Sequence, residues 1–464
     1  MQEFDISILP LLASPKTSKA LKGEGAFLLG ASKADAFPLC DGIPWLFINP
    51  AQSWAEWGAR ISQTFKSIET DIGELSKSIS DKKVLSSTKT RLKNILEGKN
   101  EQLKSLKALL KPLLGSSPIH DTSLANAFWG KFPAQQQLLS YEKNIFRDWA
   151  WNAQENKQTL DLFCKAWERK KQDLGRTLFI GAGSCRLPID VHRTLKPELS
   201  IACDLNPYLL LTAKKMIAKE TLNFFEFPHP ATDAKHACIK HPLKDTGEKL
   251  ENFHLIFCDI LKPPFKPGQF DTVITPWFID IVQVDFKVLA KLINHLLKPG
   301  GLWINLGPLL FDHCPIEGRY TLDEVKHIAL KSGLKVDIEE WADLPYLNSP
   351  NSSHKRHERV HVWLASKEKD SPLLDMKNQS HLPTWLLNPD EAIPSLNFFN
   401  AFKGTHQTYF ETVSMVDGAT SLNAIAHKLA EKHKLPAEAM LASVYRFFHT
   451  IFEQHKDSMF RGLG

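Results

Sequence analysis

The sequence predicts an α/β fold, in which helices cover both faces of a mostly parallel, seven-stranded sheet. Between Arg176 and about Lys367, short apolar runs alternate with segments of helical periodicity, and this alternation is typical of parallel sheets. A glycine-rich turn, Gly181-Ala182-Gly183, follows the first run, and the next two runs end at Asp204 and Asp259. Because parallel strands end at one edge of a sheet, these residues predict a ligand site there.

Length and composition favour a soluble, globular protein with several domains. The chain has 464 residues, 43% of them hydrophobic, and a net charge of only +5, which argues against a nucleic-acid partner. Its seven cysteines lack disulfide or metal-ligand spacing, as expected in a reducing cytoplasm. No run approaches the roughly 20 apolar residues of a membrane span, and the first residues do not resemble a signal peptide. We therefore expect a cytoplasmic protein that has no membrane partner.

Changes in the sequence pattern divide the chain into five predicted parts. Residues 1–50 are short apolar segments broken by Gly, Pro and Ser, and predict a small β-rich unit. Residues 51–134 have amphipathic helical periodicity, typical of a helical spacer or cap. Residues 135–367 contain the α/β core, residues 368–395 a polar linker, and residues 396–464 a small helical or winged-helix domain.

Six strands of the core can be placed from their apolar runs. Each run is short and bounded by polar or turn-forming residues, as buried strands are. The predicted strands are Thr177–Ile180, Leu199–Cys203, His254–Cys258, Thr272–Thr275, Leu302–Leu306 and Val360–Ala365.

The residues at the first three strand ends suit an adenosyl group. Gly181 and Gly183 let the backbone approach a ligand closely. Asp204, about 20 residues further on, can accept hydrogen bonds from both ribose hydroxyls, and Asp259 is placed to reach the adenine amino group. These features also fit an NAD enzyme, but Arg186 stands where the dinucleotide fingerprint has its third glycine.

The sequence further on favours S-adenosylmethionine (SAM) as the cofactor. The strand-like run Phe270–Thr275 is followed by Leu297-Lys298-Pro299-Gly300-Gly301 and a further apolar run, which is the layout of SAM methyltransferases. Glycine stops the preceding helix and proline prevents its continuation. The core is therefore predicted to be a Rossmann-like class I SAM methyltransferase.

Four segments resemble the carnosine N-methyltransferase family, whose members methylate a histidine imidazole. The resemblance spans about residues 135–367, with a weaker similarity at Phe227–Pro230. The segments are Arg147-Asp148-Trp149, Trp277–Asp280, Gly301–Leu310, and Tyr320–Lys326 followed by Ser332-Gly333-Leu334.

The resemblance implies roles for individual residues. In the acceptor site, Asp280 would hold the imidazole, and Trp277, Asp312 and His313 would line the substrate. Gly183 is added to the cofactor site as the second glycine of the turn. The SAM contacts implied by the family are Asn144, Arg147, Gly181, Asp204, Asp259, Ile260 and Pro276.

The chain departs from the family mainly in its substrate half. The family has Leu-Gly where Ser184-Cys185 stands, Gln at Asn144 and Glu at Asp204. After Gly-Pro-Leu-Leu it has Tyr-His, whereas Phe311-Asp312-His313 follows here, so the substrate histidine is lost or shifted by one position. A tyrosine cluster of the family is replaced by residues 354–358.

Asp280 is the residue to which we assign the chemistry of the acceptor. A neutral imidazole is nucleophilic only through its unprotonated nitrogen. A carboxylate that accepts the other N–H fixes the tautomer and stabilises the imidazolium as it forms. The alternative is that Asp280 caps a helix beginning near Val282.

The flanking parts have resemblances of their own. Leu12–Thr17 is similar to the Leu-Ala-Cys-Pro-x-Cys of zinc ribbons that accompany some methyltransferases, but Ser14 and Thr17 take the cysteine positions, so we expect no zinc. Met415–Leu422 and the helical segments after it resemble winged-helix domains that bind leader peptides. The same pattern fits a generic helical hairpin.

Three functions remain open at this stage. The first is N-methylation of an imidazole in a small histidine compound or a peptide. The second is methylation of another N, O or S nucleophile by the same core, with peptide maturation as one setting. The altered substrate half favours this function. The third is a non-catalytic scaffold or activator that keeps only the methyltransferase fold.

Overall fold

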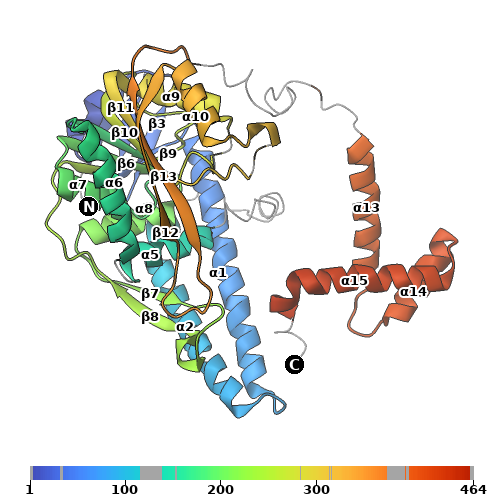
Figure 1. The fold of residues 1–464 in the computed structure, drawn as a ribbon. Coiled ribbons are helices and arrows are strands. Elements are labelled where there is room, and N and C mark those ends of the chain that lie inside the picture. Colours follow the sequence, from blue (N-terminus) through green and yellow to red (C-terminus); the bar gives the residue numbers. More distant parts are fainter. Residues whose placement is uncertain are drawn as a thin grey trace. The chain divides into compact units, whose positions relative to one another are not determined.

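The computed structural model describes residues 4–31, 35–114, 138–151, 154–282, 284–312, 314, 316–373, 392 and 397–459. The chain divides into two compact units (Figure 1). The first comprises Met1–Ile72 and Thr90–Ser380, and the second comprises Gly73–Lys89 and His381–Gly464. No helix in the described ranges is long and apolar enough to cross a membrane.

The first unit is built on a sheet of 11 strands, in the order β1-β2-β3-β4-β9-β6-β5-β10-β11-β13-β12. Strands β4 to β11 of this order run parallel, and β13 is antiparallel to β11 and β12. The seven strands from β9 to β12 confirm the predicted mostly parallel core. They are β9 (Phe253–Cys258), β6 (Leu199–Asp204), β5 (Arg176–Ile180), β10 (Phe270–Pro276), β11 (Leu297–Gly307), β13 (His357–Lys367) and β12 (Leu334–Pro345).

The N-terminal strands extend this sheet, whereas the sequence predicted a separate β-rich unit ending at residue 50. Trp45 on β4 pairs with Phe257 on β9. All four residues of β4 are buried, and Trp45 is completely inaccessible, because β4 covers what would otherwise be an open edge of the core. The four strands are β1 (Lys22–Glu24), β2 (Phe27–Leu29), β3 (Ala36–Cys40) and β4 (Ile43–Leu46), after the 3-10 helix η1 (Ile6–Leu11).

One carboxylate closes the turn that resembles a zinc ribbon. Asp35 is buried, and it accepts hydrogen bonds from the hydroxyls of Ser14 at 2.8 Å and Thr17 at 3.0 Å. These are the two residues at the cysteine positions of that resemblance. In the part of the chain that the structure describes, no group of three or more His, Cys, Asp or Glu residues could hold a metal ion.

Helices cover both faces of the sheet, and neighbouring residues of each strand enter different cores. On β5, Phe179 belongs to the core beneath α1, α5, α6, α7 and α8, whereas Leu178 and Ile180 belong to the core beneath α9 and α10, as the two-residue period of a strand requires. The helices of the first face are α1 (Pro50–Ser80), α2 (Ser86–Leu109), α3 (Lys111–Leu114), α5 (Glu142–Trp149), α6 (Gln154–Lys170), α7 (Arg186–Leu195) and α8 (Pro207–Ile217).

The second face carries α9 (Phe286–Leu296) and α10 (Leu322–Lys331), which contact each other. Short elements complete this unit. They are the 3-10 helices η3 (Leu138–Tyr141), η4 (Ala234–Ala237) and η5 (Ile316–Gly318), and a separate two-stranded sheet of β7 (Leu222–Glu226) and β8 (Ile239–Leu243).

The second unit contains three C-terminal helices, α13 (Asn397–Ser414), α14 (Leu422–His433) and α15 (Ala437–Met459). Between residues 397 and 459 the structure contains no strand. Its small core is formed by Ile425, Ala426, Leu429, Ala430 and Val444.

Candidate active site

The glycine turn after β5 adopts a left-handed backbone at both glycines. Gly181 has φ 68° and Gly183 has φ 58°, which glycine adopts at little cost. A Cβ added at Gly181 would lie 2.5 Å from the ring of Phe278, whereas one added at Gly183 would meet no atom within 4 Å. Gly181 is therefore required by packing, and Gly183 borders open space that a ligand can enter.

Asp204 at the end of β6 is hydrogen-bonded to this turn. Its Oδ2 accepts the N–H of Gly183 at 2.9 Å, and its Oδ1 accepts the N–H of Asn206 at 2.9 Å. Burial raises the pKa of Asp204 to about 6. Because a carboxylate has about four acceptor sites, Asp204 keeps acceptor capacity for a ligand.

Two further predicted cofactor residues follow β9, the strand beside β6. Asp259 accepts the N–H of Leu261 at 2.9 Å, and burial raises its pKa. Ile260 is buried in the core beneath α9 and α10. Pro276 ends β10, on the other side of β5. These residues lie at the same edge of the sheet as Asp204 because all four strands are parallel.

Helix α5 is attached to the glycine turn through Asp148. This buried carboxylate pairs with Arg147 at 2.7 Å and accepts the hydroxyl of Ser184 at 2.5 Å. The indole N–H of Trp149 donates to the carbonyl of Ser184 at 3.0 Å. Ser184, a departure from the family sequence, therefore has a specific partner. Sequence reasoning assigned no role to Asp148 or Ser184, although Asp148 stood inside the Arg-Asp-Trp segment.

Cys185 is the second departure, and its backbone explains why the family has glycine here. Its φ is 65°, in the left-handed region that other residues adopt at a cost of about 1–3 kcal/mol. The side chain is completely buried, and burial raises the pKa of its thiol well above the usual range. Cys185 is thus a packed, unreactive thiol.

An aromatic pair stands on the other side of the turn. The rings of Trp277 and Tyr346 are stacked with centroids 5.8 Å apart. The indole N–H of Trp277 donates to Oε2 of Glu358 at 3.1 Å. The guanidinium of Arg147 lies 5.8 Å from the Trp277 ring, and Asn144 hydrogen-bonds to Tyr346. These contacts connect predicted cofactor residues on α5 with the predicted substrate residue Trp277.

Tyr346 and Glu358 are residues that the sequence analysis missed as contributors to the site. Tyr346 follows β12, and burial raises its pKa. Glu358 lies near the start of β13 and forms an ion pair with Arg356, whose guanidinium lies 5.1 Å from the Tyr346 ring. One feature of the sequence could have pointed to these residues. Residues 354–358 replace a tyrosine cluster that the family has at this position.

Asp280 connects the two loops that follow β10 and β11. Its side chain is buried, and its Oδ2 accepts the N–H of Leu310 at 3.0 Å. The N–H of Trp277 donates to the carbonyl of Leu306 at 2.6 Å. Because Gly307 has no side chain, its backbone can pack against Trp277; an added Cβ would lie 3.1 Å from the Trp277 Cα.

The alternative that Asp280 caps a helix is wrong. Helix α9 begins at Phe286, and its cap is Asp285, which accepts the N–H of Lys287 at 2.7 Å. Of the other predicted substrate residues, Asp312 is exposed in the loop after β11, and His313 lies outside the described residues.

Comparison with known proteins gives a family match over residues 128–369, more than half of the chain, to the model described as carnosine N-methyltransferase. The carnosine N-methyltransferase of Schizosaccharomyces pombe is 24% identical over 276 residues, covering 50% of this chain and 71% of that protein. The enzyme of Dictyostelium discoideum is 32% identical over 89 residues, which are 19% of each chain. The chain thus matches only about a fifth of the Dictyostelium relative.

Solved methyltransferase structures are more distant. Phosphoethanolamine N-methyltransferase 2 of Haemonchus contortus, in complex with S-adenosyl-L-methionine, is 16% identical with a TM-score of 0.33, covering 55% of this chain and 61% of that one. A sarcosine dimethylglycine methyltransferase homologue of Galdieria sulphuraria is 11% identical with a TM-score of 0.31, covering 46% and 87%.

Proposed function

The chain belongs to the carnosine N-methyltransferase family, and from this premise we propose that it is a SAM-dependent methyltransferase acting on an imidazole nitrogen. The acceptor is a small histidine-containing molecule or a histidine in a peptide. The observation that supports this acceptor best is the buried carboxylate of Asp280, held between the loops that follow β10 and β11.

The turn after β5 and the end of β6 fit the adenosyl group of SAM. Gly183 borders open space, and Asp204 retains acceptor capacity beside it. Arg147 uses part of its guanidinium on Asp148, which leaves donors for the carboxylate of the methionyl moiety. When bound, SAM supplies a sulfonium whose methyl group is already activated for transfer.

The main task of the protein is therefore to orient the acceptor. In our proposal, the imidazole lies near Trp277 and donates its N–H to Asp280, so that its other nitrogen, which carries the lone pair, attacks the methyl carbon. The N–C bond forms as the S–C bond breaks, and the carboxylate stabilises the imidazolium until the N–H proton is released to solvent. The N–H of Leu310 supports this role because it fixes one oxygen of Asp280.

Product analysis tests the proposal directly. The protein is incubated with methyl-labelled SAM and, separately, carnosine, histidine and histidine-containing peptides, and fragmentation mass spectrometry locates the label. We expect a labelled imidazole in at least one product. Label only on another N, O or S atom would support the second function, and no SAM binding in calorimetry would support the non-catalytic scaffold.

We also propose that the C-terminal helices present peptide substrates to the core. Their small core leaves large apolar side chains exposed, with Phe410 at 76% and Tyr445 at 58% exposure. A contiguous apolar patch marks a surface that binds a partner, and in our proposal these side chains contribute to such a patch. Removal of residues 396–464 should lower kcat/KM for a histidine-containing peptide that carries its leader and leave the value for carnosine unchanged. An equal loss for both substrates would contradict this role.

A further inference from the structure

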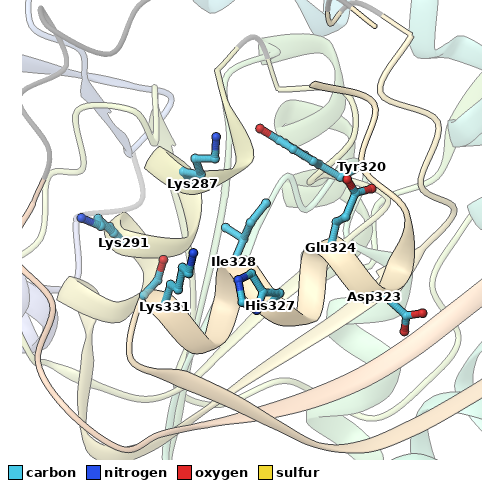
Figure 2. A pocket seen from close by; sticks show the side chains of 9 residues that line it. Lys287, Lys291, Tyr320, Asp323, Glu324, His327, Ile328 and Lys331 are labelled. Atoms are coloured by element: carbon cyan, nitrogen blue, oxygen red, sulfur yellow. The ribbon is translucent and has the colours of Figure 1, made fainter. Parts of the chain in front are cut away.

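A cavity of about 580 Å³ lies between α9 and α10, on the face of the sheet that these helices cover. Figure 2 shows the side chains that line it. Lys287 and Lys291 come from α9, His327 and Lys331 from α10, and Tyr320 from the loop before α10. None of these residues belongs to the site described above.

The basic residues are spaced so that they face the cavity from both helices. Lys287 and Lys291 are four residues apart on α9, and His327 and Lys331 are four residues apart on α10, so each pair lies on one face of its helix. Lys291 and Lys331 have no ion-pair partner among the residues that the structure describes. Unpaired ammonium groups that share a cavity repel each other unless an anion lies between them.

The two carboxylates that line the cavity each interact with a neighbouring group. Glu324 accepts the N–H and the hydroxyl of Thr321, both at 2.8 Å, in the capping box of α10. Asp323 pairs with Lys326 at 3.0 Å, and its carboxylate points away from the lysines (Figure 2). The lining therefore holds three lysines against two carboxylates, an excess of one positive charge.

Lys287 stands where helix stability alone disfavours a cation. It lies in the first turn of α9, and the N-terminal end of a helix dipole is positive. Its ammonium lies 5.6 Å from the centroid of the Tyr320 ring, and the hydroxyl of Tyr320 donates to Asp285, the cap of α9, at 3.0 Å. The carboxylate of Asp285 already balances this helix end, so an anion in the cavity is drawn to Lys291 and Lys331.

We propose that this cavity binds a phosphate group, either as inorganic phosphate or as the phosphate of a small phosphomonoester. A phosphate dianion offers several acceptor oxygens, so it can bridge lysines that line the cavity from two helices. A carboxylate has fewer oxygens and half the charge. The volume is that of a small-molecule site, and the buried side chain of Ile328 provides an apolar wall for the organic part of an ester.

Calorimetric titration at low ionic strength tests the site. The probes are inorganic phosphate and O-phosphoserine, with chloride at matched ionic strength as the reference. We expect saturable binding of at least one phosphate probe, and a loss of tenfold or more in affinity in the double variant Lys291→Ala/Lys331→Ala, because each lost charge-assisted hydrogen bond costs about 1.5 kcal/mol or more. The Lys291→Arg variant keeps its charge and should keep most of the affinity.

A matched control removes one lysine elsewhere. Lys240 on β8 is exposed, and Lys240→Ala lowers the net charge without touching the cavity. Its phosphate affinity should equal that of the parent. The proposal is overturned if the parent shows no saturable binding of either probe, or if the double variant and Lys240→Ala bind alike. Tighter binding of O-phosphoserine than of phosphate identifies an ester as the ligand, and equal binding identifies the free ion.

Discussion

The cofactor half and the acceptor half of the candidate site are built in different ways. The cofactor half is mainly backbone: two left-handed glycines and main-chain N–H groups that hold Asp204. The acceptor half is mainly side chains, with Trp277, Tyr346 and Glu358 brought together from three separate strand ends. A site built on backbone tolerates few changes of local sequence, whereas one built on side chains can change its specificity by exchanging a few residues.

The strongest test of this contrast is Asp280→Asn in the acceptor half. The amide oxygen can still accept the N–H of Leu310, so the loops should stay in place. The amide lacks the negative charge that stabilises an imidazolium, so we expect kcat to fall roughly 1,000-fold. Steady-state kinetics with the best acceptor, together with SAM calorimetry, measure both halves in one protein.

Asp285→Asn is the matched control, since Asp285 caps α9. It should lower the melting temperature slightly and leave kcat close to that of the parent. If Asp280→Asn lost SAM affinity as well as turnover, the two halves would not be separable as we describe.

Asp204→Asn should weaken the binding of SAM instead. We expect the Kd for SAM to rise about 10- to 100-fold, because a charge-assisted hydrogen bond contributes about 1.5–3 kcal/mol. Since the pKa of Asp204 is about 6, SAM affinity of the parent should decrease as the pH falls below 6 and the carboxylate is protonated. The variant should lack this dependence. Calorimetry between pH 5 and pH 8 checks both points, because this range extends about one pH unit or more to each side of that pKa.

The same carboxyl affects folding in the opposite sense. Its folded pKa is raised from 3.8 to about 6, so the folded state binds the proton more tightly than the unfolded chain. Its contribution to stability is fully present below about pH 4 and is lost as the pH rises through 6. A SAM affinity that did not change between pH 5 and pH 8 would show that the ionisation of Asp204 does not govern binding.

Two glycine variants test whether packing or ligand access requires each glycine of the turn. Gly181→Ala combines a positive φ with a contact 2.5 Å from Phe278, and should destabilise the protein by about 2–4 kcal/mol. Gly183→Ala has a similar φ but open space around the new methyl group, so it should cost only about 1 kcal/mol while strongly weakening SAM binding. Thermal unfolding without SAM and a SAM titration separate the two effects. Equal melting temperatures would contradict the packing role of Gly181.

The smallest effect is expected at Glu358→Gln. The glutamine oxygen can still accept the indole N–H of Trp277, but the ion pair with Arg356 is lost. We expect KM for the acceptor to rise about threefold with kcat unchanged, which corresponds to about 0.6 kcal/mol for an ion pair whose Arg356 partner is half-exposed. Asp343→Asn, which removes the exposed pair between Asp343 on β12 and Arg359 on β13, is the control and should change neither constant.

The same contrast explains what the sequence could and could not predict. Gly181, Asp204 and Asp259 lie at strand ends as predicted, because each comes at the end of an apolar run that local pattern locates. Tyr346 and Glu358 were missed because their partner Trp277 is 81 residues from Glu358 in the chain, and nothing local records that pairing. His313 and Asp312 remain predictions.

Two features of the fold were missed for related reasons. Strand β12 alternates buried and exposed residues, with charged side chains on its outer face, so its sequence lacks the continuous apolar run by which the other core strands were found. The joining of β4 to β9 depends on a pairing between residues about 210 positions apart, Trp45 and Phe257. The sequence pattern predicted that residues 1–50 form strands. It could not predict which strand of the core they join.

That pairing has a consequence for synthesis on the ribosome. The buried side chains of β4, including Trp45, cannot be covered by β9 until Phe253–Cys258 has been made. At a translation rate of about 5–20 residues per second, this interval is about 10–40 s. During that time the apolar N-terminal strands stay exposed on a nascent chain, where they are a target for a chaperone. β4 can pair with β9 only after the glycine turn and Asp204 have been made, and before the acceptor half has been.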